Sequence, residues 1–124
     1  MKDRFEDYFN SFCREVHDDC VKAGWWTNLE DGSPKDRNLG ELLMLCVTEL
    51  AEAYEGERKG MMDKHLPQYR AFDVELADLI IRVADIAGNR KIPLGKIIQE
   101  KRDYNAVRAD HKIENRMAVG GKKF

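Results

Sequence analysis

The stretch "ELADLIIRVADIAG" (residues 75–88) decides the fold of this chain. Its apolar residues recur at helical spacing and cover most of the circumference of a helix. Its charged residues Glu75, Asp78, Arg82 and Asp85 share one narrow strip. A helix this apolar is expected to be buried on nearly all sides. Three carboxylates along one edge of it therefore need an explanation other than an ordinary solvent-facing surface.

The apolar periodicity predicts four helices and no convincing strand, so the fold class is expected to be all-α. The helices are expected to span about residues 5–23, 38–58, 72–90 and 94–110. Asn38 suits an N-cap and Pro93 suits the first turn of a helix. A four-helix bundle is the natural architecture. Because so apolar a third helix needs more cover than one chain supplies, we expect a homodimer or a dimer of dimers.

Length and composition limit the class of protein. The 124 residues are expected to form a single domain over residues 1–124, with a polar C-terminal tail from about residue 111. The net charge of −2 gives no general attraction to a nucleic acid polymer, and no apolar run is long enough to suggest a membrane partner. Cys13, Cys20 and Cys46 form no CxxC pair, and the start shows no signal-peptide pattern. We therefore expect a cytoplasmic protein with reduced thiols.

A second strip of carboxylates lies in "LLMLCVTELAEAYEG" (residues 42–56). Glu49 falls inside the apolar face of this predicted helix, and Glu52 lies at the edge of that face one turn later. Residues three apart on a helix sit about 5–6 Å apart at Cβ, so each of the pairs Glu49/Glu52 and Glu75/Asp78 can converge on one small object. An antiparallel return of the chain would let the two pairs face each other.

Four carboxylates in one helical seam require a counter-charge. Two like charges ~4 Å apart repel by about 4 kcal/mol at an effective dielectric constant of about 20. A set of oxygen ligands favours a hard divalent cation, Mg²⁺ or in its place Mn²⁺. The predicted metal ligands are Glu49, Glu52, Glu75 and Asp78.

These carboxylates could also have a role other than metal binding. A lone ExxE pair is usually a solvated helix face, but Glu49 interrupts an apolar stripe and the second strip is narrow. Asp85 is expected to pair with Arg82 or Lys59. A di-iron bundle requires Glu-x-x-His pairs. None of the three histidines has a glutamate three positions before it, so di-iron chemistry is disfavoured.

The segment "EKRDYNAVR" (residues 100–108) forms a polar helix face. Lys101, Tyr104, Asn105 and Arg108 recur at i, i+3, i+4 and i+7 and supply two cations, a phenol and an amide. Lysine offers a point charge and arginine a planar fork, so this face suits a polyphosphate. Taken alone it would also fit a solvated surface, but the nearby carboxylates favour phosphate binding.

Two tryptophans, Trp25 and Trp26, stand in the predicted loop before the second helix. Adjacent side chains point in different directions, so at least one is expected to pack in the core. The other could offer a flat surface to a nucleobase, since stacking on an aromatic ring contributes roughly 1–3 kcal/mol per base. Both are therefore candidate base-binding residues.

Together these motifs resemble the MazG-like all-α nucleoside triphosphate pyrophosphohydrolases of the small single-domain bacterial and phage type. The matching pattern is Glu49-x-x-Glu52, a spacer, Glu75-x-x-Asp78, and then Lys101-x-x-Tyr104-Asn105-x-x-Arg108. The resemblance covers roughly residues 38–124. It implies a MazG-like bundle that assembles into dimers or tetramers.

The resemblance also implies an activity and roles for residues. The expected reaction converts a nucleoside triphosphate and water into a nucleoside monophosphate and pyrophosphate, as nucleotide-pool housekeeping. The four carboxylates would hold Mg²⁺, and Lys101, Asn105 and Arg108 would contact phosphate. Glu49 or Glu52 would act as the base for the attacking water.

Two alternative functions remain open. A phosphoribosyl-ATP pyrophosphohydrolase would have similar carboxylate spacing. A non-catalytic helical oligomerisation module would use the apolar faces for assembly and the charged strips for salt bridges between chains. Within the main hypothesis, dCTP, dUTP, dGTP or a mixture all stay possible as substrates, and the number of metal ions is open.

Overall fold

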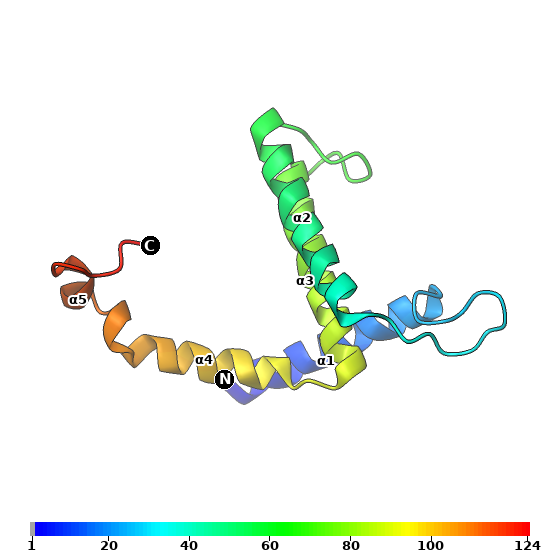
Figure 1. Cartoon of the computed structure of the whole chain (residues 1–124), viewed down its shortest axis with the longest axis horizontal. Coiled ribbons are helices and arrows are strands. Elements are labelled where there is room, and N and C mark those ends of the chain that lie inside the picture. The colour runs from blue at the N-terminus through cyan, green and yellow to red at the C-terminus, as the bar shows by residue number, and fades with distance from the viewer. Residues whose placement is uncertain (1) are drawn as a thin grey trace. The chain divides into compact units, whose positions relative to one another are not determined.

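The computed structural model describes residues 2–124 and is all-α in this range (Figure 1). Its four main helices are α1 (Lys2–Lys22), α2 (Leu39–Lys59), α3 (Ala71–Arg90) and α4 (Leu94–Val107). A 3₁₀ turn, η1 (Ala109–His111), and a short helix, α5 (Ile113–Met117), follow. The described residues contain no strand, although two isolated bridges join Thr27 to Pro34 and Met62 to Arg70. The all-α class and the four predicted helices are confirmed.

The helix ends follow local capping chemistry. Asn38 is the N-cap of α2, and its Oδ1 accepts a hydrogen bond of 3.0 Å from the backbone N–H of Glu41. Gly60 ends α2 in the left-handed conformation (φ 59°), which glycine adopts without steric penalty. The fourth helix ends at Val107 and not at the predicted Asp110, because the backbone of Arg108 is extended (φ −70°, ψ 139°).

The described residues fall into two compact units. The larger is Ser11–Ile92, and the other joins the residues up to Asn10 with Pro93–Phe124. In the smaller unit α4 packs on the first turns of α1, where the backbone N–H of Gly95 donates to Asn10 Oδ1 (2.8 Å) and Lys2 pairs with Asp103 (3.0 Å). The segment predicted as a polar tail contributes α5 to this unit, and η1 occupies the predicted end of the fourth helix.

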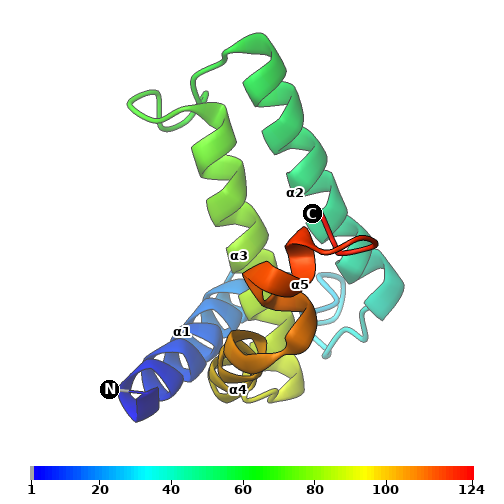
Figure 2. The same cartoon turned by 90° about the vertical axis from the view of Figure 1, so that its left-hand side faces the viewer.

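The centre of the larger unit is an antiparallel hairpin of α2 and α3 (Figure 2). Leu42, Cys46 and Ala53 of α2 are buried. At the closed end of the hairpin, an added Cβ on Gly56 would lie 2.9 Å from the Cβ of Ala71, so only glycine lets the two helices approach this closely. The segment between residues 60 and 70 returns the chain at that end.

The second half of α1 packs against α3 within the same unit. Gly88 of α3 lies directly against the Cys13 carbonyl and the Cβ of His17. Asp85 is buried, and its Oδ1 is 2.8 Å from His17 Nδ1 and 2.9 Å from Trp26 Nε1. The prediction that Asp85 pairs with Arg82 or Lys59 is therefore wrong. Its hydrogen-bond partners are His17 of α1 and Trp26 of the following loop.

In the single chain, α3 is not covered on all sides. Ala84 and Ala87 are buried, whereas Leu76, Ile80 and Ile81 are 39–48% exposed. The wide apolar surface of α3 is therefore only partly used by contacts within residues 2–124. Among the same residues, no helix combines the length and the apolar character that crossing a membrane would require.

The contact at Gly88 yields a stability prediction. Helix propensity alone would make Gly88→Ala stabilising by about 1 kcal/mol. The added methyl group would lie 2.6 Å from the Cβ of His17 and even closer to the Cys13 carbonyl. We expect a net loss of about 1–3 kcal/mol in the free energy of unfolding, as is typical of overpacking.

Chemical denaturation followed by circular dichroism measures this change. Asn89→Ala, at an exposed position of the same helix, is the matched control and should change stability by less than about 0.5 kcal/mol. A Gly88→Ala protein more stable than the parent would contradict the close packing of α1 on α3.

Candidate metal centre

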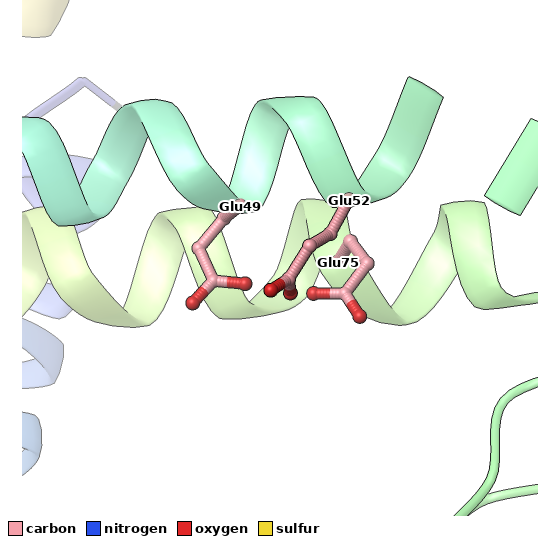
Figure 3. A group of neighbouring side chains, drawn as sticks. All are labelled: Glu49, Glu52 and Glu75. Atoms are coloured by element: carbon pink, nitrogen blue, oxygen red, sulfur yellow. The ribbon is translucent and has the colours of Figure 1, made fainter. Parts of the chain in front are cut away.

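Three carboxylates converge across the hairpin (Figure 3). Glu49 and Glu52 extend from α2 and Glu75 from α3, and one oxygen atom of each lies within 4.8 Å of the others. Three of the four predicted metal ligands are thus brought together. The fourth, Asp78, stands one turn after Glu75 on α3 and is not part of this group.

The burial of this group follows from the sequence pattern. Glu49 is 6% exposed because it lies within the apolar face of α2 that packs on α3. Glu75 is partly buried, and Glu52, at the edge of that face, is exposed. The carboxylates therefore run from the interior of the hairpin to its surface, where a ligand can reach them.

Arg82 compensates part of the negative charge. Its Nε donates to Glu49 Oε1 at 2.6 Å. Burial is the largest single influence on Glu49 and would raise its pKa. The hydrogen bond and the charge of Arg82, together with hydrogen bonding to Glu75 and Glu52, outweigh burial, so the pKa lies below its ordinary value. Glu49 is thus held ionised in the seam.

The pKa of Glu75 is shifted in the opposite direction to that of Glu49. Burial, followed by the proximity of Glu49 and the charge of Glu52, raises its pKa to about 8. Among residues 2–124, its Oε2 is the one buried side-chain oxygen or nitrogen without a hydrogen-bond partner. Burial and the charge of Glu49 also raise the pKa of Asp78. Without a cation, the seam must therefore hold protons to relieve its repulsion.

The donor set fits a hard divalent cation. All three converging groups are carboxylates, which suit Mg²⁺ or Mn²⁺ better than the softer metals that bind thiolate or imidazole. Three carboxylates and the Arg82 guanidinium leave two negative charges, which one divalent cation balances. The unpartnered oxygen of Glu75 is a donor atom that a cation would satisfy.

Two cavities lie beside the carboxylates and share Asp78 in their walls. The first, here called the loop-side cavity, has a volume of about 590 Å³ and is walled by Glu52, Glu75 and the loop after α2. The second, here called the tryptophan-side cavity, has a volume of about 440 Å³. Its walls include Glu49, Arg82, Trp25, Arg37, Leu45 and Ile81. The acidic group is therefore accessible from both directions along the hairpin.

The two tryptophans separate as expected. Trp26 is 9% exposed and donates from Nε1 to Asp85, while the guanidinium of Arg37 lies 5.0 Å from the centroid of its ring. Trp25 is 63% exposed and lines the tryptophan-side cavity. Of the two candidate base-binding residues, only Trp25 has its side chain exposed at a cavity.

The predicted phosphate-binding residues lie on α4 and at its end, in the smaller unit. The ammonium group of Lys101 is 4.7 Å from the centroid of the Tyr104 ring. Arg108 makes a two-pronged contact with Asp110, with distances of 2.6 and 2.7 Å. Asn105 Oδ1 lies 3.4 Å from Arg108 Nη1. The structure thus places these four residues together, with the Arg108 fork occupied by Asp110.

Sequence reasoning missed the groups that accompany the carboxylates. The sequence pattern pairs Arg82 with Asp85 and not with Glu49, and it does not place Lys64 and His65 of the α2–α3 loop beside the carboxylates. A signal for the loop was present. A segment that joins two helices must lie at the end of their seam, and Asp63 begins a turn that holds Lys64 and His65 at that end.

None of the protein-family models, curated proteins and solved structures matches this chain. The motif resemblance to MazG-like enzymes therefore stays an expectation drawn from the spacing of a few residues. The features of this chain that bear on its function are the carboxylate group, the two cavities beside it and the exposed apolar surface.

The raised pKa of Glu75 predicts how stability depends on pH. Native Glu75 keeps its proton up to about pH 8, whereas the unfolded chain releases it near the ordinary value of 4.5. The folded state therefore binds more protons in this window, and the metal-free protein should lose stability as the pH rises through it. Added Mg²⁺ should raise the melting temperature more at the alkaline end, where protons no longer compete.

Differential scanning calorimetry in chelator and then in Mg²⁺, at about pH 5.5 and about pH 8.5, measures both effects. Glu75→Gln should flatten the pH dependence and reduce the response to Mg²⁺. Glu41→Gln, at an exposed position on the same hairpin, should behave as the parent. Identical pH profiles for Glu75→Gln and the parent would contradict a proton held in the seam.

Proposed function

We propose that the chain is a Mg²⁺-dependent nucleoside triphosphate pyrophosphohydrolase of the cytoplasm that cleaves a (d)NTP to a (d)NMP and pyrophosphate. The observation that carries this proposal is the convergence of Glu49, Glu52 and Glu75 around a buried, unpartnered carboxylate oxygen. The MazG-like spacing of the motifs supports the choice of substrate class and the role in nucleotide-pool housekeeping.

Glu49, Glu52 and Glu75 would hold the cation, with Asp78 at the junction of the two cavities as a fourth ligand. Bound Mg²⁺, or Mn²⁺ in its place, would supply neutralisation of phosphate charge and polarisation of the attacking water. The chain's own task is to hold these oxygen atoms close together in spite of their repulsion. Packing of α2 on α3 and the Arg82 contact to Glu49 accomplish this.

The geometry favours Glu52 over Glu49 as the general base. The ionised carboxylate of Glu49 accepts a hydrogen bond from Arg82 Nε, which lowers the pKa of Glu49 and weakens it as a proton acceptor. Glu52 is exposed and faces the loop-side cavity. In the proposed step, water gives its proton to Glu52, its oxygen bonds to the α-phosphorus, and the bond to the leaving pyrophosphate breaks. Lys101, Asn105 and Arg108 stay predicted phosphate ligands on the grounds of motif spacing.

Pyrophosphate release from a panel of nucleoside triphosphates tests this proposal. With Mg²⁺ the parent should release pyrophosphate from at least one substrate. Glu52→Gln should lower kcat at least a hundredfold, because a positioned general base typically contributes 10²–10⁴-fold. Glu41→Gln, outside both cavities, should retain full activity. If no triphosphate is cleaved, or if Glu52→Gln turns over like the parent, the proposed mechanism is wrong.

An exposed apolar stripe on α2 supports the proposed homo-oligomer. Residues of the stripe recur every three or four positions and are 36–67% exposed; they are Leu39, Leu43, Val47, Leu50 and Tyr54. A stripe with this spacing is suited to packing against another helix. We propose that a second copy of the chain covers it in a homodimer or homotetramer. The stripe would equally serve a non-catalytic oligomerisation module, which is the second candidate function.

Sedimentation velocity at micromolar concentration measures this assembly. Leu50→Lys places a charge in the stripe and should shift the protein towards monomer. Leu29→Lys, at an exposed loop position outside the stripe, should leave the sedimentation coefficient unchanged. A monomeric parent protein would exclude both the proposed oligomer and the oligomerisation module. Assembly without metal binding or turnover would favour the module.

A further inference from the structure

The loop-side cavity contains basic groups as well as carboxylates. Its wall contains the basic groups of Lys64 and His65 from the α2–α3 loop and five carboxylates, those of Glu52, Glu55, Asp63, Glu75 and Asp78. All of them belong to the larger unit and to one connected cavity of about 590 Å³. The Lys64 ammonium and the His65 imidazole thus line the same space as the carboxylates of the proposed metal site. This arrangement is suited to binding an anion that also contacts the metal.

The loop is held in a defined conformation. Asp63 Oδ2 accepts hydrogen bonds from the backbone N–H groups of His65 (2.9 Å) and Leu66 (2.8 Å). The backbone N–H of Asp63 donates to the Tyr69 carbonyl, and that of Tyr69 donates to the Leu66 carbonyl, both at 2.9 Å. Lys64 lies in the sequence between residues held by these hydrogen bonds, so its backbone has a fixed position beside the cavity. Ligand binding therefore costs little conformational entropy of the loop backbone.

The charges near the closed end of the hairpin show which basic groups are available. Arg58 and Lys59 both pair with Glu55, at 3.1 and 2.9 Å. Arg70 pairs with Asp73 at 2.9 Å. Within residues 2–124, by contrast, the side chains of Lys64 and His65 take part in no salt bridge or hydrogen bond. These two groups are therefore the ones at this end that remain available to an external anion.

The two cavities differ in chemistry. The loop-side cavity has no Trp, Tyr or Phe in its wall, whereas the tryptophan-side cavity combines the exposed indole of Trp25 with Leu45 and Ile81. The two cations of the tryptophan-side cavity are already engaged, because Arg82 donates to Glu49 and Arg37 lies on the ring of Trp26. A flat nucleobase is stabilised by stacking on an aromatic ring. A diphosphate group is instead stabilised by cations and N–H donors. The two ends of a nucleotide are therefore suited to different cavities, with the carboxylates between them.

On the basis of the proposed function, we infer that the substrate binds along the hairpin in one direction. Its β- and γ-phosphates occupy the loop-side cavity, where Lys64 contacts them as a point charge and His65 as a hydrogen-bond donor. Its base lies in the tryptophan-side cavity on Trp25, and the α-phosphate lies over the carboxylates. Lys64 and His65 then stabilise the charge that develops on the pyrophosphate leaving group.

Isothermal titration calorimetry with inorganic pyrophosphate in Mg²⁺ tests this inference. The variants are Lys64→Gln and His65→Ala, and the control is Lys22→Gln, an exposed lysine of α1 that lines neither cavity. One charge-assisted contact corresponds to a loss of about tenfold to a hundredfold in pyrophosphate affinity for Lys64→Gln. Loss of a neutral hydrogen bond predicts about threefold to tenfold for His65→Ala. The control should bind pyrophosphate like the parent.

Two further titrations test whether Lys64 contacts the β-phosphate end of the nucleotide. Affinity for Mg²⁺ alone and for a deoxynucleoside monophosphate should be the same in Lys64→Gln as in the parent, because neither ligand has a β-phosphate. If Lys64→Gln binds pyrophosphate like the parent, or loses monophosphate affinity to the same extent, the inference is overturned while parent turnover keeps the proposed function intact. If the parent binds neither Mg²⁺ nor pyrophosphate and cleaves no triphosphate, the proposed function fails and the inference with it.

Discussion

The repulsion among Glu49, Glu52 and Glu75 is the constraint on which the rest of the structure depends. Once Glu75 loses its proton, three like charges at such distances oppose the packing of α2 on α3, so the hairpin needs a strong contact elsewhere. The approach at Gly56, where α3 begins against α2, and the buried apolar face of α2 supply it. A cation would relieve the repulsion. The stronger the repulsion in the metal-free protein, the more favourable the free energy of cation binding. Metal affinity and metal-free instability thus have the same origin.

The partner of Arg82 depends on contacts one turn away. Arg82 and Asp85 are three residues apart on α3, a spacing at which they would ordinarily pair. Here Asp85 accepts from Trp26 and contacts His17, so its oxygen atoms are already satisfied. Arg82 is therefore left to donate to Glu49. The packing of α1 and the following loop on α3 thereby sets the charge of the carboxylate group, even though neither segment contributes one of its carboxylates.

Periodicity predicts the helices and three members of the carboxylate group, but it also assigns Asp78 to that group, which the structure leaves outside it. The position of Glu49 inside an apolar stripe predicts its burial, because helical geometry fixes which residues share a face. Periodicity does not rank competing partners, so the choice of Arg82 between Glu49 and Asp85 required the three-dimensional contacts. Nor does it apply to the α2–α3 loop, where hydrogen bonds to Asp63 place Lys64 beside the carboxylates. Periodicity also does not show which of Trp25 and Trp26 packs in the core; their exposure in the structure shows that it is Trp26.

Helix α2 has two apolar faces with different roles. One face carries Cys46, Glu49 and Ala53 into the hairpin, and the other presents Leu43 and Leu50 to solvent in the single chain. A second copy that packs on the exposed face would restrict the motion of α2 and hence of Glu49. Assembly would then already reduce the conformational entropy of α2 and Glu49, and cation binding would have less of this entropy to remove. The same helix therefore gives a physical reason why assembly and metal binding would favour each other in this fold, without any residue of the exposed stripe touching the metal.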